Sequence, residues 1–516
     1  MNRRDLIKQS VASGVACTLP STLAAETRGN EKLKASPLIG VHIAAHSLLD
    51  EGIDHALDLL ADTAGVNTLF VSSNMYYGAM LRPKAAQADH GVPIHDGVGR
   101  KVTPIFFRPN ERFYSQTKLR HGLIDPNTEL AGREIFAELA EPARKRGMRV
   151  YERLYEPGDA FRDSRIINGP QVQAIDCQGQ RFPKPCWNHP EYRSFLAASL
   201  TDLFSSYPLD GLQYGSERLG PISTLLANRG PLFCYCEHCH ARSKAISIDG
   251  RRAVDGAQRL TAWTAARLNP DARRPIDGVL IEFLRILMEF PELLAWEKMQ
   301  YQAWHEVHQL VFDTVKKVKP AAHVGRHVDH AQGSYDLLLR AAVPYTAMAD
   351  AGAEFLKIST YSEIMGPRLA QLINGPHGKT IFGDLPAQKS LELFYALAGL
   401  DPAKEPPLAT LPGQGTGTEY VFHEIKRAVE GVAGKAEIYA AVALDIPIGK
   451  GWGDKARPSD PQLIRQSIRK AFDAGASGLV ICREYEEMTI PSLRAIGQVR
   501  VPGAFFRTKP SEKKAS

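Results

Sequence analysis

Three cysteines lie within six positions of the sequence: Cys234, Cys236 and Cys239. This Cys-x-Cys-x-x-Cys spacing places three thiolates in one turn of chain, where a soft metal such as zinc can bind all of them. The fourth ligand is expected to be Cys186, Cys177 or His240. A tetrahedral site filled by four protein ligands leaves no position for water, so we expect this zinc to be structural.

A glutamate, Glu217, comes shortly after the apolar run at 211–215. A carboxylate at the end of a buried strand can act as a general acid/base, although an exposed helix cap would have the same pattern. The neighbouring Arg218 would lower the pKa of Glu217, so a role as catalytic acid requires burial or a second carboxylate.

Glycoside hydrolysis requires such a pair of carboxylates, about 5 Å apart in retaining enzymes and roughly 6.5–9.5 Å apart in inverting ones. The candidates for the partner are Asp445, Glu484 and Glu363. Asp445 is an acid within an apolar run, and buried acids are usually paired or functional, so we favour it slightly. Glu484 has more charged neighbours and could begin a solvated helix.

Eight strand-like runs alternate with helical or loop segments and would position these residues. The runs are 38–43, 67–72, 148–152, 211–215, 323–327, 355–361, 437–444 and 478–482. This alternation predicts an α/β fold, a (β/α)₈ TIM barrel with long insertions in the βα loops. An open, doubly wound sheet is the alternative, but no glycine-rich phosphate loop follows the first run.

Polar residues stand at or just beyond the C-terminal ends of these runs, where a (β/α)₈ barrel builds its active site. Those we expect to bind substrate are His42, Asn74, Glu152, Arg218, His327 and Tyr361. His327 and His330 could also bind a second metal. Side chains along a strand alternate between its two faces, however, so residues three apart point in opposite directions.

We expect one catalytic domain over residues 31–505, with a cysteine-rich, metal-binding insertion at about 220–245. The stretch from about 75 to 128 is rich in polar residues, proline and glycine. It is expected to be a loop over one face of the fold, outside the core. Residues 506–516 are expected to form a disordered, charged tail.

The first 30 residues have the features of an export signal. Asn2-Arg3-Arg4-Asp5-Leu6-Ile7-Lys8 matches the twin-arginine pattern, and small residues follow near Ala25, the expected cleavage site. The seven cysteines do not resemble a disulfide framework. Because the twin-arginine route carries folded proteins, zinc could be bound in the cytoplasm before transfer. We therefore expect a periplasmic or secreted protein.

The composition excludes several classes of partner. The 516-residue chain is 44% hydrophobic and 23% charged, with a formal net charge of +6 and dispersed basic residues. Without a basic face, nucleic acid is not an expected partner. After residue 30, no apolar run reaches the roughly 18 residues that a membrane span needs.

The order of these motifs resembles that of family 42 glycoside hydrolases, which are β-galactosidases with a (β/α)₈ catalytic domain. The likeness covers about 55 residues, from Cys186-Trp187-Asn188-His189-Pro190 through Glu217 to the Cys-x-Cys-x-x-Cys run. It implies zinc bound by Cys186 and the three clustered cysteines, Glu217 as acid/base, and a nucleophile on the seventh strand. The sequence departs from the family at Ser216, where the family has asparagine, and at Asp445, where it has glutamate.

The sequence therefore predicts an exported glycoside hydrolase that acts on an oligo- or polysaccharide, with structural zinc beside its active site. The departures at Ser216 and Asp445 leave a carbohydrate-binding barrel without hydrolysis as an alternative. A metal-dependent hydrolase or isomerase using His327 and His330 is another.

Overall fold

We describe the protein from a computed structural model. It describes residues 37–74, 76, 89–91, 103–122, 124–156, 158–162, 165–216, 220–329, 336–448, 455–483 and 485–499. All the described residues belong to one compact unit, Pro37–Ser516. The predicted export signal and the predicted C-terminal tail lie outside the described residues.

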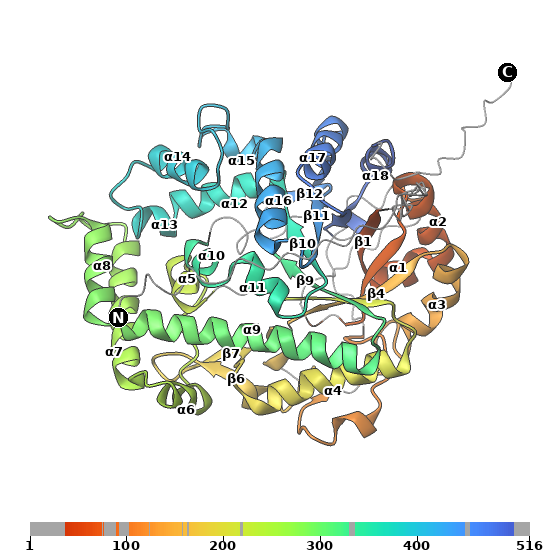
Figure 1. Ribbon diagram of the computed structural model, residues 1–516, viewed down its shortest axis with the longest axis horizontal. Coiled ribbons are helices and arrows are strands. Elements are labelled where there is room, and N and C mark those ends of the chain that lie inside the picture. Colours follow the sequence, from red (N-terminus) through yellow and green to blue (C-terminus); the bar gives the residue numbers. More distant parts are fainter. Residues whose placement is uncertain are drawn as a thin grey trace, which may run out of the picture. The chain divides into compact units, whose positions relative to one another are not determined.

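Eight parallel strands close into a barrel, which confirms the predicted TIM-barrel fold (Figure 1). The strands pair in the order β1-β2-β4-β8-β9-β10-β11-β14 and back to β1. Their bounds are β1 Leu38–Ala44, β2 Thr68–Ser72, β4 Arg149–Tyr155, β8 Gly211–Gly215, β9 His323–Val328, β10 Phe355–Ser359, β11 Glu437–Ala443 and β14 Gly478–Cys482.

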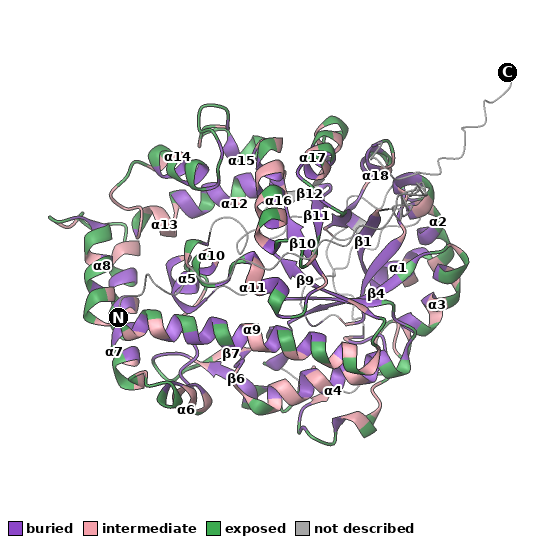
Figure 2. Cartoon of the chain, in the orientation of Figure 1, coloured by how far each residue is buried: buried purple, intermediate pink, exposed green. Residues whose placement is uncertain are grey.

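The strands are buried on both faces, as Figure 2 shows, because side chains alternate between the lumen and the surrounding helices. In β4, Tyr151 contacts Phe70 and Phe355 across the lumen, with ring centroids 5.1 and 6.2 Å apart. The neighbours Val150 and Leu154 belong to the core between strands and helices. Side chains on one face of β4 therefore fill the barrel, and those on the other face pack against the helices.

Helices cover the outside of the barrel and form its insertions. They are α1 Ala45–Glu51, α2 Ile53–Ala64, α3 Ile135–Lys145, α4 Pro190–Ser206, α5 Pro221–Leu226, α6 Glu237–Ala245, α7 Gly250–Leu268, α8 Val279–Glu289, α9 Glu292–Val318, α10 Leu337–Ala342, α11 Tyr345–Asp350, α12 Ser362–Asn374, α13 Pro376–Lys379, α14 Ala387–Leu397, α15 Leu411–Gln414, α16 Thr418–Val432, α17 Pro461–Asp473 and α18 Ile490–Gly497. Within the part of the chain that the structure describes, no helix is long and apolar enough to cross a membrane.

Insertions after β4 and β8 build a second hydrophobic core beside the barrel. The strands β6 Gln173–Ile175 and β7 Arg181–Pro185 form an antiparallel hairpin, which packs with helices α5 to α9. The remaining strands form short antiparallel pairs: β3 Arg120–His121 with β5 Ile166–Ile167, and β12 Ile446–Ile448 with β13 Lys455–Arg457.

The prediction that the 75–128 stretch lies outside the core is wrong for residues 103–122. Ile105, Phe106, Phe107 and Tyr114 are buried and belong to the main hydrophobic core. These apolar residues do not recur at a helical or strand period, so no regular pattern in the sequence indicates their burial.

Candidate active site and metal centre

The lumen of the barrel has an apolar layer and a polar layer above it. The apolar layer comprises Leu38, Phe70, Tyr151, Phe355, Tyr439 and Val480. Two to four residues further along several of the same strands, toward their C-terminal ends, stand His42, Arg153 and Lys357. Polar side chains in a TIM barrel gather at this end because the βα loops form the active site there.

His42 on β1 is one of the predicted substrate-binding residues, and its side chain lies in the lumen. Its Nε2 is 3.1 Å from Oε1 of Gln213 on β8, and its ring is 6.5 Å from that of His327. Burial, reinforced by the positive charges of Arg153 and Lys357, holds the pKa of His42 well below its usual value. His42 is therefore neutral at pH 7 and can both donate and accept a hydrogen bond.

Lys357 on β10 is the centre of this polar layer, and the sequence analysis did not identify it. Its Nζ lies 3.1 Å from Nδ1 of His327, 3.0 Å from Oγ of Ser359 and 2.5 Å from the hydroxyl of Tyr361. Burial lowers the pKa of this amine. The charge of Asp329 and a hydrogen bond with Cys482 oppose this effect of burial.

The predicted residues His327 and Tyr361 are thus brought together by a lysine. Nδ1 of His327 is also 3.5 Å from the hydroxyl of Tyr155 at the end of β4. A Cβ on Gly215 of β8 would lie only 2.6 Å from Cβ of His327. Glycine at position 215 therefore leaves the space that the His327 side chain occupies in the lumen.

Two other predicted substrate-binding residues lie away from this group. Glu152 is fully buried, but it follows the lumen residue Tyr151 and so points outward, toward the helices. Burial raises its pKa to about 8, so Glu152 is largely protonated at pH 7. Asn74, just beyond β2, accepts a hydrogen bond through Oδ1 from the backbone N–H of Tyr76 at 3.3 Å. These placements favour structural roles for both residues.

Asp445 lies after β11, the seventh barrel strand, where a catalytic partner was predicted. Its Oδ1 accepts hydrogen bonds from the backbone N–H of Ser459 at 2.9 Å and from Oγ of Ser492 at 2.8 Å. Its Oδ2 accepts one from the backbone N–H of Thr489 at 2.5 Å. These contacts join the loop after β11 to the N-terminal ends of α17 and α18. The geometry is that of a structural carboxylate.

Glu363, the other candidate partner, begins α12 beside this loop. Oγ of Ser459 donates a hydrogen bond to its Oε2 at 2.7 Å. Burial, opposed by that bond and by Arg457, raises the pKa of Glu363. The remaining predicted site residues, Glu217, Arg218 and Glu484, lie outside the described residues, as does His330.

The second core contains a buried cluster of four cysteines. The sulfur atoms of Cys186, Cys234, Cys236 and Cys239 all lie within 4.8 Å of one another. Those of Cys186 and Cys239 are 3.5 Å apart, and those of Cys186 and Cys236 are 3.4 Å apart. Four sulfurs about 2.3 Å from a tetrahedral zinc would be about 3.8 Å apart, so the cluster has the dimensions of a metal site.

Neighbouring amides donate hydrogen bonds to the sulfur atoms. Nδ2 of Asn188 and Nε2 of Gln300 lie 3.3 and 3.4 Å from Sγ of Cys239, and the backbone N–H of Ile175 lies 3.3 Å from Sγ of Cys234. Such donors stabilise thiolates, which are the form that binds a metal. Cys186 is thus the fourth member of the cluster, and Cys177 and His240 are not part of it.

The cysteine cluster is connected to the mouth of the barrel through two buried side chains. Cys186 is followed by Trp187, whose Nε1 donates a hydrogen bond to Oε2 of Glu156 at 2.7 Å. Glu156 directly follows β4, and its backbone N–H donates to the carbonyl of Gly215 at the end of β8. A metal in the cluster would therefore stabilise the chain beside the C-terminal end of the fourth barrel strand.

No protein-family model matches the sequence, and no curated protein matches it significantly. Similar solved structures include two β-galactosidases. One, from the psychrophilic Marinomonas ef1, is 9% identical, with 89% of this chain and 58% of that chain covered and a TM-score of 0.47. The other, from the Antarctic haloarchaeon Halorubrum lacusprofundi, is 11% identical, with 89% and 57% covered and a TM-score of 0.48.

An α-L-fucosidase isoenzyme 2 from Paenibacillus thiaminolyticus is 11% identical, with a TM-score of 0.41. The alignment covers 89% of this chain and 48% of the fucosidase, so this chain spans about half of that protein. These structural neighbours are glycoside hydrolases. At such low identity, the activity of this chain has to be inferred from its own residues.

Proposed function

We propose that this protein is an exported glycoside hydrolase that binds its sugar at the C-terminal mouth of the barrel. The polar layer of the lumen is the observation that carries the proposal. His42 with Gln213, and Lys357 with Tyr361, present hydrogen-bonding groups above an apolar floor. A sugar offers many neutral hydroxyl groups, and a site of this kind satisfies them while its apolar floor excludes water.

In this proposal, Glu217 is the acid/base. It follows β8 after one intervening residue, at the strand end where the resemblance to family 42 glycoside hydrolases places the catalytic acid. Glu217 would donate a proton to the glycosidic oxygen as the bond from that oxygen to the anomeric carbon breaks. A second carboxylate would then attack that carbon or remove a proton from the water that does so.

Glu484 is our preferred partner for Glu217. Asp445, which the sequence slightly favoured, has its carboxylate occupied by three hydrogen-bond donors, and this lowers its suitability as a nucleophile or base. Glu484 follows β14, the eighth strand, after one intervening residue. We retain Asp445 as the second choice.

We further propose that the four clustered cysteines bind zinc. The bound zinc would cross-link β7, α6 and the segment between α5 and α6, and would supply no catalytic step because all four positions are taken by sulfur. We also propose export by the twin-arginine route to the periplasm or beyond. Since this route carries folded proteins, zinc bound before transfer would protect these thiols from oxidation.

The test is hydrolysis of a panel of aryl glycosides and plant or algal oligosaccharides by wild type and Glu217→Gln. We expect kcat to fall by at least about 100-fold in the variant, with unchanged thermal unfolding, because the glutamine cannot transfer the proton. The matched control is Glu437→Gln, since Glu437 begins β11 at the opposite end of the barrel. Analysis of the product anomer would then show how the second carboxylate acts.

A carbohydrate-binding barrel without hydrolysis is the second candidate, and the engaged carboxylate of Asp445 favours it. Binding of an oligosaccharide by wild type without cleavage of any substrate in the panel would support this candidate. It would also contradict the role of Glu217 as a catalytic acid.

A further inference from the structure

An apolar cavity lies outside the barrel lumen, among the helices of the insertions. It has a volume of about 380 Å³ and is lined by residues of α5, α8, α12, α13 and α14 and by the segment 336–338 at the start of α10. This volume is within the range of roughly 300–1,000 Å³ that small-molecule sites occupy. The helices α5 and α10 lie in the connections after β8 and β9, so the cavity is built on the C-terminal side of the barrel.

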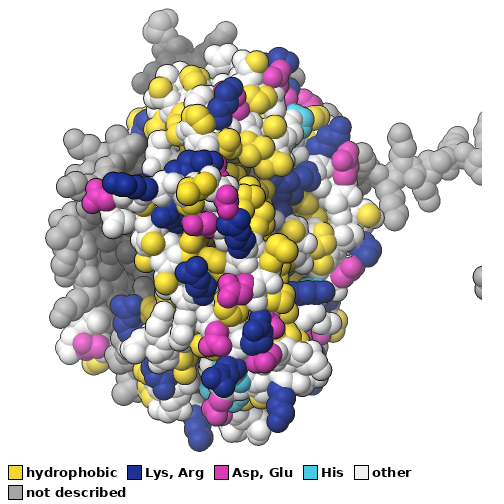
Figure 3. All heavy atoms as spheres, turned by 90° about the vertical axis from the view of Figure 1, so that its left-hand side faces the viewer, with side chains coloured by type: hydrophobic (Ala, Val, Ile, Leu, Met, Phe, Trp, Pro, Cys, Tyr) yellow, Lys and Arg dark blue, Asp and Glu magenta, His cyan; other side chains and the backbone are white. Residues whose placement is uncertain are grey.

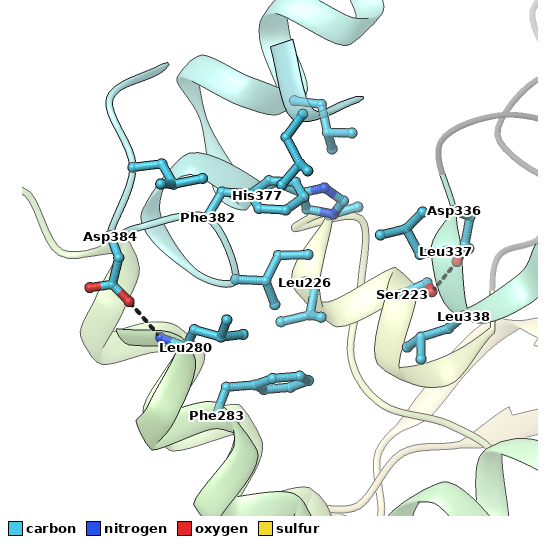
Figure 4. Close-up of a pocket in the computed structure, with 15 residues that line it drawn as sticks. Ser223, Leu226, Leu280, Phe283, Asp336, Leu337, Leu338, His377, Phe382 and Asp384 are labelled. Carbon is cyan, nitrogen blue, oxygen red and sulfur yellow. Dashed lines mark hydrogen bonds between the residues drawn. The ribbon is translucent and has the colours of Figure 1, made fainter. Parts of the chain in front are cut away.

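Most of the cavity wall is hydrophobic. Phe283 of α8 forms one side, Leu226 of α5 and Leu338 of α10 lie nearby, and Phe382 lies opposite, as Figure 4 shows. Such a wall favours an apolar ligand, because each Å² of apolar surface removed from water contributes about 25 cal/mol.

A buried carboxyl group stands at one side of this cavity. Oδ1 of Asp336 accepts a hydrogen bond from Oγ of Ser223 at 2.7 Å (Figure 4). It also accepts one from the backbone N–H of Leu339 at 3.0 Å. Its other oxygen, Oδ2, is buried and has no hydrogen-bond partner among the described residues. Burial raises the pKa of Asp336, so its carboxyl group takes up a proton more readily than an exposed aspartate does. An unsatisfied buried oxygen of this kind requires a partner.

In the view of Figure 4, His377 lies between Asp336 and Asp384. Burial, reinforced by the charge of Arg229, lowers its pKa to about 4, so its ring is neutral at pH 7. Asp384, on the far side, is engaged with the backbone N–H groups of Val279 and Leu280. The polar groups that face a ligand are therefore Asp336, with Ser223 bound to it, and His377, and none of them requires the ligand to be charged.

The rim of the cavity continues into an exposed apolar surface. Leu280, Leu337, Leu385 and Leu393 line the cavity and are still 38–42% exposed. Figure 3, which faces this side of the molecule, shows hydrophobic side chains gathered in a band between charged ones. An amphiphile could therefore place its polar end beside Asp336 and leave part of its apolar body against this rim.

We propose that this cavity binds a neutral, hydrophobic alcohol, whose hydroxyl group hydrogen bonds to Oδ2 of Asp336 and to the ring of His377. An alcohol can bind both Asp336 and His377, because a hydroxyl donates one hydrogen bond and accepts others. A carboxylate of the same chain length is disfavoured, since its charge would lose its hydration beside a buried acid. The proposal concerns a site outside the lumen and does not depend on glycoside hydrolysis.

The test uses the fluorescence of N-phenyl-1-naphthylamine, a neutral apolar probe, with the full-length protein. We expect saturable binding of one probe per chain, and displacement by 1-decanol at a concentration at least about tenfold lower than by decanoate. In Ala227→Phe, the larger ring would fill part of the cavity and weaken probe binding at least about tenfold. Leu294→Phe, at an exposed site of α9 that does not line the cavity, should leave binding unchanged.

A His377→Phe variant separates the polar contact from the apolar one. It keeps an aromatic ring but removes both nitrogens, so probe binding should persist while the preference for decanol over decanoate falls at least about threefold. If Ala227→Phe does not fold, Leu393→Trp at the rim takes its place. Absence of saturable binding, equal displacement by decanol and decanoate, or full binding in a folded cavity-filling variant would overturn the proposal.

Discussion

The cysteine cluster and the polar layer of the lumen are two sites of opposite construction. Three of the four clustered cysteines lie within six residues of one another, and the fourth follows a short hairpin strand. The polar layer is built from strands that run from β1 to β10, and the hydrogen bond between His42 and Gln213 joins residues 171 positions apart. One site is mostly local in the sequence, with Cys186 joining it from 50 residues before Cys236, and the other depends on closure of the whole barrel.

The two sites also differ in how their charges are compensated. Beside the cysteine cluster, Arg242 and Arg193 pair with Glu306 at 2.6 and 2.8 Å. In the lumen, the amine of Lys357 has no ion pair among the described residues, and only the charge of Asp329 and the neighbouring Cys482 oppose the effect of its burial. A buried amine without a paired acid costs stability and is usually retained for function. We infer that the cluster stabilises the fold, whereas the polar layer costs stability and serves the proposed binding of sugar.

The largest loss of stability is expected from Cys236→Ser. A serine oxygen is a poor ligand for zinc at a thiolate site, so the variant should lose its metal and the second core should unfold well below the wild-type temperature. Metal analysis of the purified protein should give one zinc per chain for wild type and none for the variant, and calorimetry should show the earlier transition.

Cys177→Ser is the matched control for this prediction. Cys177 is a buried cysteine of the same core, but it lies outside the cluster, and its Sγ is 3.8 Å from Oγ1 of Thr261. This variant should retain the metal. Equal zinc content in Cys236→Ser and wild type would mean that the cluster is not the metal site.

The next largest effect is a loss of activity in Lys357→Met. This prediction rests on the proposed hydrolase activity. Methionine fills a similar volume without the charge, so His327 and Tyr361 lose the amine that lies between them. We expect kcat/KM to fall by about 100-fold, or about 2.7 kcal/mol, on any glycoside that wild type cleaves. The thermal midpoint should change little, because the gain from removing a buried amine is offset by the loss of its hydrogen bonds to His327, Ser359 and Tyr361.

The control for the lumen is Lys316→Met on α9. Lys316 pairs with Glu354 at 2.9 Å outside the lumen, so hydrolysis should be unaffected there. If Lys357→Met retained wild-type kcat/KM, the polar layer would have no part in the reaction. A fall in the thermal midpoint together with activity would instead assign Lys357 a structural role.

The fold and three of the four clustered cysteines could be predicted because their signals are local. Strand-like runs alternate with helical segments, and Cys-x-Cys-x-x-Cys is a ligand spacing in itself. The residues alone left Cys186, Cys177 and His240 open as the fourth ligand, and only the family resemblance favoured Cys186. The roles of Glu152 and Asp445 depended on which way one side chain points and on donors from distant loops, such as the N–H of Thr489. Lys357 had a signal that we did not use: the alternation Lys357-x-Ser359-x-Tyr361 puts three polar groups on one face of an otherwise apolar strand.

The barrel and the region of the cysteine cluster also differ in how their stability depends on pH. Burial raises the pKa of Glu152 in the barrel wall to about 8, compared with about 4.3 in an unfolded chain. The folded state therefore holds a proton that the unfolded state releases between these values, and stability falls as the pH rises from about 4.3 to about 8. Hydrogen bonds from Arg242 and Arg193 lower the pKa of Glu306, beside the cysteine cluster, to about 2. The contribution of Glu306 to the free energy of unfolding is present above about pH 4.3 and is lost as the pH falls toward 2.

We therefore expect Glu152→Gln to change the pH profile rather than the fold. Glutamine has the shape of the protonated acid and does not titrate, so the free energy of unfolding should fall less steeply between pH 5 and 8, by up to about 1.4 kcal/mol per pH unit. Urea unfolding at a series of pH values measures this slope, with Glu430→Gln on the exposed face of α16 as the control. Glu306→Gln should instead alter the profile only below about pH 4.3. A Glu152→Gln profile that parallels the wild type would mean that Glu152 is ionised in the folded protein, and that the barrel wall near β4 admits water or a cation.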